Sequence, residues 1–159
     1  MLDPNIRPAL IPDAAAHRDR IMRMVALADI VKVSEEDLDW LGNPDPACWL
    51  AMGVSLAIVT RGEHGATAFT AWHTTVAEPP CKVQGNTVGA GDNFLAGVLA
   101  RLARDELLDP ERLPILTQEQ VSRALDTGCR AAALRIAHPE GRAPSWSQLQ
   151  AFAAGSTAP

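Results

Sequence analysis

Apolar residues recur along the chain with two different periods, which together predict helices alternating with strands. After Asp13, which can cap a helix, the spacing i, i+3, i+4, i+7 predicts a helix beginning near Ala14. Its buried face comprises Ile21, Met24, Val25 and Ala28. Residues 30–33 and 55–60 predict strands, and the second run is apolar throughout, as in strands buried on both faces. Residues 66–72 and 74–76 predict a further pair of strands.

The remaining predicted elements are helices. Short helices are expected to end near residue 41 and to span 47–52, and a longer one should open from the glycine-containing loop 85–92. The pairs Thr117/Gln120 and Ser145/Gln148 have capping-box spacing and predict two more helix starts, the last helix reaching about residue 154. Strands that alternate with helices indicate an α/β layer fold with a mostly parallel sheet.

Composition narrows the class of protein without identifying it. The chain has 159 residues, a formal charge of −5 and 47% hydrophobic residues, which is typical of a single globular domain. No apolar run reaches the roughly 18 residues of a membrane span, and no basic cluster favours nucleic acid as a partner. The first ten residues are polar and contain prolines, unlike a secretory signal. Three widely spaced cysteines predict reduced thiols in a cytoplasmic protein.

The most informative stretch is G-N-T-V-G-A-G-D-N-F at residues 85–94. Glycines at 89 and 91 allow backbone N–H groups to point into one concavity, at the positive end of the helix that follows. Such a site binds an anion or stabilises charge in a transition state. Asp92 is then either a base that takes a proton from a hydroxyl or simply a cap of the helix. No Lys follows the loop, and position 94 is Phe, so neither the Walker loop nor G-x-G-x-x-G is present.

The stretch resembles the D-T-x-G-A-G-D signature of the ribokinase/PfkB family of carbohydrate kinases. Three other segments, which precede this stretch, occur in the same order as in the family. D-P-N-I-R-P at 3–8 is similar to the D-x-N-x-R stretch of fructokinase-like members, 31–38 to the segment with N-x-x-E, and 60–65 to T-x-G-x-x-G. The resemblance covers nearly the whole chain.

The resemblance implies a doubly wound, ribokinase-like α/β fold and phosphorylation of a sugar hydroxyl with ATP and Mg²⁺. It makes Asp92 the catalytic base and gives the anion hole to Gly89, Ala90 and Gly91. The residues it assigns to the nucleotide side are Thr60, Gly62, Gly65, Asn86, Thr87 and Cys129. Asn5 and Arg7, with Asp92, are assigned to the substrate and phosphate path, although Asn5 and Arg7 could instead brace a turn.

Four positions depart from the family's pattern. Asn86 replaces the first Asp of the signature, in a region that often helps to hold a monovalent cation, so such a cation is left open. Ser34 and Asp37 replace N-x-x-E, and the pair reads either as a capping box or as part of a magnesium shell. Cys129 stands where an adenine-side Asn is common.

The length also departs from the family, whose members are roughly twice as long as a single domain of this size. We expect residues 1–154 to be the C-terminal part of a ribokinase-like kinase domain, truncated on its N-terminal side, and 155–159 to be a frayed tail. The sugar-binding glycines and the β lid of the family then have no counterpart here. An uncovered sheet edge predicts self-association or a homo-oligomer.

The leading hypothesis is therefore an ATP-dependent, fructokinase-like sugar kinase. Fructose is the first candidate substrate, while ribose, 2-keto-3-deoxygluconate and nucleosides stay open. The alternative is a catalytically inactive nucleotide-binding fragment that lacks the sugar-binding half. A third reading is an α/β domain that is not a kinase and whose glycine loop binds another anion.

Overall fold

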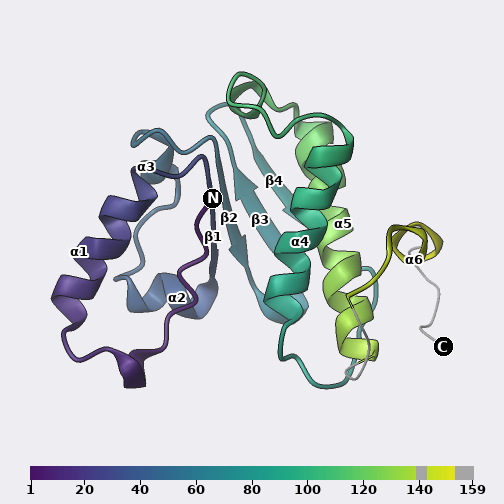
Figure 1. The fold of residues 1–159 in the computed structure, drawn as a ribbon, viewed down its shortest axis with the longest axis horizontal. Helices are drawn as coiled ribbons and strands as arrows, with labels where there is room; N and C mark the ends of the chain where they lie inside the picture. Colours follow the sequence, from purple (N-terminus) through teal and green to yellow (C-terminus); the bar gives the residue numbers. More distant parts are fainter. Residues whose placement is uncertain (139–142, 153–159) are drawn as a thin grey trace.

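The structure is a computed structural model that describes residues 1–138 and 143–152. Helices flank a central sheet on both sides, with α1, α2 and α3 on one face and α4 and α5 on the other (Figure 1). The α-helices are α1 (Ala14–Val25), α2 (Glu35–Trp40), α3 (Ala47–Leu50), α4 (Ala90–Arg104), α5 (Gln118–Ala137) and α6 (Trp146–Ala151). The strands are β1 (Ile30–Ser34), β2 (Leu56–Thr60), β3 (Ala66–Phe69) and β4 (Thr74–Ala77), and the 3-10 helices are η1 (Pro8–Leu10), η2 (Gly62–His64) and η3 (Leu113–Ile115).

The sheet has the strand order β1-β2-β3-β4 and is mixed, which corrects the expectation of a mostly parallel sheet. Only β1 and β2 run parallel, whereas β2–β3 and β3–β4 are antiparallel. The reason is connection length. The parallel pair is joined through α2 and α3, but the turns at 61–65 and 70–73 are too short for a crossover and force hairpins. At the free edge of β1, Leu2 forms a parallel bridge to Val31.

Two hydrophobic cores lie on the two faces of the sheet. Strand β2 contributes to both, because alternate residues point to opposite faces. Leu56 and Ile58 pack with α4 and α5, whereas Ala57 and Val59 pack with α1 and the fully buried Trp49 of α3. This confirms that the apolar run at 55–60 is a strand buried on both faces.

Local sequence signals place most helix starts correctly. Asp13 accepts a hydrogen bond from Ala16 N, and Thr117/Gln120 and Ser145/Gln148 form the predicted capping boxes. One predicted core position is wrong: Met24 is 46% exposed, because Ile21 and Val25 form the buried face of α1. Ala28 is buried as predicted, but it lies beyond the end of the helix at Val25. The predicted frayed tail at 155–159 lies outside the described residues.

Helices α4 and α5 approach each other at backbone distance. A Cβ on Gly97 would lie 2.8 Å from the carbonyl oxygen of Thr127, and a Cβ on Gly128 would lie 2.8 Å from that of Phe94. This packing fixes α4 against the sheet, so the start of α4 is held at the carboxyl ends of β1 and β2 (Figure 1). In the part of the chain that the structure describes, no helix combines the length and apolarity needed to cross a membrane.

Candidate active site

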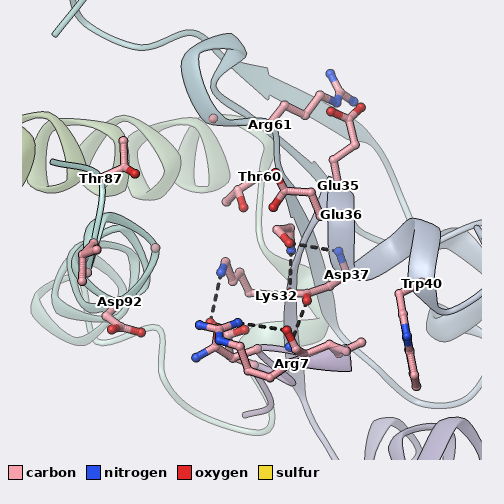
Figure 2. A pocket seen from close by; sticks show the side chains of 18 of the residues that line it. Arg7, Lys32, Glu35, Glu36, Asp37, Trp40, Thr60, Arg61, Thr87 and Asp92 are labelled. Atoms are coloured by element: carbon pink, nitrogen blue, oxygen red, sulfur yellow. Dashed lines mark hydrogen bonds and ion pairs between the residues drawn. The ribbon is translucent and has the colours of Figure 1, made fainter. Parts of the chain in front are cut away.

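A cavity of about 760 Å³ opens where β1 and β2 end and α4 begins. Ligands of doubly wound α/β folds bind at the carboxyl ends of the strands, and this cavity occupies that place. Its walls come from four segments: residues 3–8, the end of β1 with α2, the end of β2, and the loop into α4. Figure 2 shows Asp92 on one side, with Lys32 and Arg7 reaching toward it from the other.

The start of α4 leaves backbone donors free at the cavity. Gly89 is the N-cap and adopts the left-handed conformation, with φ 80° and ψ 2°. Its carbonyl oxygen accepts from Asn93 N and Asn93 Nδ2, and Ala90 N donates to Thr87 O. Among the described residues, nothing accepts a hydrogen bond from the amides of Gly91 and Asp92. Two free N–H groups at a helix N-terminus form a site suited to an anion.

Asp92 lies in the first turn of α4 and lines the cavity with an exposed side chain. The structure overturns the interpretation of Asp92 as a helix cap, since Gly89 holds the N-cap position and α4 has no side-chain cap hydrogen bond. Within the described residues its carboxylate has no hydrogen bond or ion pair that would divert it from the cavity. A carboxylate in this position can accept a proton from a hydroxyl placed beside the free amides.

The loop before Gly89 is shaped by Asn86. Its Oδ1 accepts a hydrogen bond from Val88 N at 2.9 Å, which closes a local turn. Thr87 and Gly89 line the cavity, whereas Asn86 does not. Of the two nucleotide-side residues predicted in this loop, Thr87 therefore lies in the cavity wall, whereas Asn86 lies outside it and stabilises the turn.

At the end of β2, Thr60 and Gly62 line the cavity and Gly65 does not. Thr60 Oγ1 donates to Val33 O at 3.3 Å, so the two parallel strands stay joined where the cavity begins. Gly65 has φ 80°, and a Cβ there would lie 2.0 Å from the carbonyl oxygen of Ala77. The hairpin and its close approach to β4 therefore require a glycine at position 65, and no contact with a ligand is needed to explain it.

The segment before α1 forms another wall, which Asn5 and Arg7 line as predicted. Asn5 has a positive φ of 43°, and Arg7 Nη1 donates to Ile6 O at 2.9 Å. Arg7 therefore braces the turn, as one of the two predictions has it, and also lines the cavity. Its guanidinium also remains on the cavity side, where Figure 2 shows it extending toward Asp92.

Asp37 fixes this wall to α2. Its Oδ1 accepts from Ile6 N at 2.9 Å, and its Oδ2 accepts from Ser34 N at 3.4 Å. Asp37 N in turn donates to Ser34 Oγ at 3.0 Å, so the predicted capping box is confirmed. The side chain is buried, and both of its oxygens are engaged by backbone amides. A magnesium role for Asp37 stays a prediction that this geometry does not support.

Cys129 is not brought to the cavity. It is 6% exposed in the core between α4, α5 and the sheet. Burial, with a smaller contribution from the Asp126 charge, raises the pKa of the Cys129 thiol to about 12. It therefore behaves here as a small buried hydrophobe.

Sequence reasoning missed Lys32, which lines the cavity from β1. It is 6% exposed, and its Nζ lies 3.1 Å from Asp3 Oδ2. A signal was present in the sequence, since I-V-K-V-S places one cation inside an otherwise apolar strand. A charge at such a position is seldom buried without a partner.

The cavity lining carries charges of both signs. Three cations, Arg7, Lys32 and Arg61, line it together with five carboxylates, those of Asp3, Glu35, Glu36, Asp37 and Asp92. The free amides at the start of α4, with Lys32 nearby, give an anion a place at one end of the cavity. The described residues contain no group of three or more His, Cys, Asp or Glu arranged to hold a metal ion. Magnesium in nucleotide sites is usually held by one or two carboxylates together with the phosphates, so this observation is compatible with an ion that arrives with the nucleotide.

Comparisons with known proteins identify the family of this chain. Residues 1–148 match the pfkB family of carbohydrate kinases, and the chain belongs to that family. A fructokinase from Rhizobium leguminosarum bv. trifolii is 41% identical over 130 residues, covering 79% of this chain and 40% of the relative. A fructokinase from Salmonella thompson is 36% identical over 143 residues, covering 82% of this chain and 62% of the relative.

Solved structures show the same fold. A fructokinase double mutant from Vibrio cholerae O395, in a fructose-, ADP- and potassium-bound form, superposes with a TM-score of 0.78 at 28% identity. The match covers 95% of this chain and 49% of that one. The predicted ribokinase-like α/β fold is thereby confirmed, and the chain spans less than two thirds of the length of these relatives.

Proposed function

We propose that this chain takes part in the ATP-dependent phosphorylation of a sugar hydroxyl, with fructose as the first candidate sugar. The observation that carries the proposal is the start of α4. There Asp92, whose carboxylate has no hydrogen bond or ion pair among the described residues, stands beside free backbone amides at the carboxyl ends of β1 and β2. Family membership and the fructokinase relatives support the same reaction class.

The chemistry assigned to these groups is in-line phosphoryl transfer. Asp92 would accept the proton of the attacking sugar hydroxyl, which raises the nucleophilicity of its oxygen. Of the predicted anion hole at Gly89, Ala90 and Gly91, the amide of Ala90 is already engaged by Thr87 O. The free amides of Gly91 and Asp92 would therefore stabilise negative charge on the transferred phosphoryl group. Because these donors are fixed by the helix before the substrate arrives, little reorganisation is needed as charge develops.

The nucleotide would lie along the end of β2 and the loop into α4, lined by Thr60, Gly62 and Thr87. Mg²⁺, when bound with the nucleotide, would neutralise part of the phosphate charge. The relatives described as holding ADP with potassium or calcium are compatible with ion-assisted nucleotide binding. The substitution of Asp by Asn at position 86 removes one carboxylate from this loop, so we expect only weak activation by a monovalent cation.

Asp92→Asn tests this assignment, because it removes the base and preserves the shape of the side chain. We expect fructose-dependent ADP formation to fall by about 10²- to 10⁴-fold, while the affinity for Mg·ATP is unchanged. Asp19→Asn, which makes the same change on the exposed face of α1, is the matched control. Turnover by Asp92→Asn within twofold of the unsubstituted chain would refute the assignment. Nucleotide binding without turnover in the unsubstituted chain would instead identify an inactive fragment.

A further inference from the structure

The last turn of α5 meets the start of α4, behind the loop that borders the cavity. The two helices pack antiparallel, with Gly97 against Thr127 and Gly89 against Arg135. A Cβ added to Gly89 would lie 3.4 Å from Arg135 Nε and 3.9 Å from Arg135 Nη2. Gly89 lines the cavity and Arg135 does not, so the guanidinium reaches the Gly89 turn from the side away from the cavity.

The guanidinium of Arg135 lies between the ends of two helices. Arg135 is half-buried, and its Nη1 donates to His138 O at 3.4 Å, at the C-cap of α5. A cation in the last turn of a helix is favoured by the negative end of the helix dipole. The same guanidinium also lies against Gly89, the N-cap of α4, where the dipole is positive and disfavours a cation.

The start of α4 is a place where an anion would remove this conflict. Among the described residues, the amides of Gly91 and Asp92 are free, and no side chain from 85 to 91 carries a charge. The carboxylate of Asp92 is the one negative charge on α4. A guanidinium against this N-terminus therefore destabilises the empty site, and it attracts any anion that is held on the free amides.

We propose that Arg135 is a positioning residue of the anion site at the start of α4. Its guanidinium braces the Gly89 turn, whose backbone has φ 80°, and adds a permanent positive charge behind the free amides of Gly91 and Asp92. Arg135 does not touch the nucleotide. It acts through Gly89 on how strongly these amides hold a multiply charged phosphate group. This inference rests on the proposed function.

Calorimetric titration of Mg·ATP into the purified chain and its variants tests this role. Arg135→Met removes the charge and keeps an apolar stem, and we expect it to weaken ATP binding by about 3- to 30-fold. Arg135→Lys keeps the charge and should bind ATP within about twofold of the unsubstituted chain. The penalty of Arg135→Met should shrink as the ionic strength rises from about 0.1 M to about 1 M, because the Debye length falls from about 10 Å to about 3 Å.

Two further variants separate the charge from other effects of the substitution. Arg23→Met removes the same charge from the last turn of α1, at an exposed position outside the cavity lining, and should leave ATP affinity unchanged. Arg135→Gln removes the charge and keeps N–H donors for His138 O, so it should lose as much ATP affinity as Arg135→Met. If Arg135→Met does not fold, the comparison of Arg135→Gln with Arg135→Lys decides.

The outcomes separate this proposal from the proposed function. Loss of ATP affinity in both uncharged variants, with recovery in Arg135→Lys, supports the role of Arg135. The role is overturned if Arg135→Lys binds ATP as weakly as Arg135→Met, if the penalty is the same at both ionic strengths, or if Arg135→Met lowers only the Tm; in each case the proposed function stands. If the unsubstituted chain does not bind ATP, both proposals fail.

Discussion

The carboxylate of Asp37 offers a quantitative test of how the cavity is built. Asp37→Ala removes the acceptor of the buried hydrogen bond from Ile6 N at 2.9 Å and the longer one from Ser34 N at 3.4 Å. The first is a hydrogen bond to a charged group, for which a loss of about 1.5–3 kcal/mol is typical. Removing a negative charge from the first turn of α2 adds roughly 0.3–1 kcal/mol.

Together these terms predict that Asp37→Ala lowers the free energy of unfolding by about 2–4 kcal/mol. For a chain of 159 residues this corresponds to a decrease in Tm of roughly 4–16 °C. The assay is urea unfolding followed by far-UV circular dichroism, with thermal unfolding alongside. The Ser34 hydroxyl keeps its bond to Asp37 N in the variant, so α2 itself should survive.

Two controls make the prediction specific. Glu36→Ala removes the same charge from the same turn, but Glu36 is exposed, so a loss below about 1 kcal/mol is expected. Asp37→Asn keeps one carbonyl oxygen for Ile6 N and should fall between the two. The reasoning is refuted if Asp37→Ala is no less stable than Glu36→Ala. A stable Asp37→Ala variant that had lost only Mg²⁺-dependent nucleotide binding would favour the magnesium role.

Three further predictions concern helix packing and the cysteines. Gly128→Ala places a Cβ 2.8 Å from both Phe94 O and Val98 Cγ2. The overpacking should cost about 1–3 kcal/mol and outweigh the roughly 1 kcal/mol gain in helix propensity. Urea unfolding measures the difference, and a stabilised variant would contradict the close packing of α4 on α5. In the native protein, iodoacetamide should modify the exposed Cys48 and spare Cys129 until the protein unfolds, as mass spectrometry of the peptides would show. Because the pKa of Cys129 is raised from 9.0 to about 12, the unfolded chain loses this proton first, and stability should fall as pH rises through that interval. A Cys129→Ala variant should lose this fall in stability at high pH, and an unchanged pH profile of stability would contradict the raised pKa of Cys129.

The parts of the fold that were predictable depend on neighbours in the sequence. Asp13, Thr117 and Ser145 identify helix starts because a cap acts within three residues. The short turns at 61–65 and 70–73 also contained the information that the sheet is mixed. The error at Met24 arose because periodicity defines a face, while the width of the contact depends on how α1 meets the sheet.

Site residues that lie together in one loop could be predicted from the sequence, whereas residues brought together from distant segments were harder to predict. Asp92, Gly89 and Thr87 belong to one loop, and the structure places them together in the cavity wall. Lys32 and Gly91 meet only through the packing of α4 beside β1, which no local pattern encodes. Gly65 and Cys129 were assigned to the site by resemblance alone, and the structure places them in a hairpin and in the core.

Calorimetric titration of Mg·ATP into the purified chain, with Mg·GTP and inorganic phosphate as controls, tests most directly whether this cavity is a nucleotide site. The account predicts micromolar binding of one nucleotide per chain, with ATP preferred over GTP and phosphate bound far more weakly. Absence of ATP binding, or equal affinity for ATP and inorganic phosphate, would contradict it.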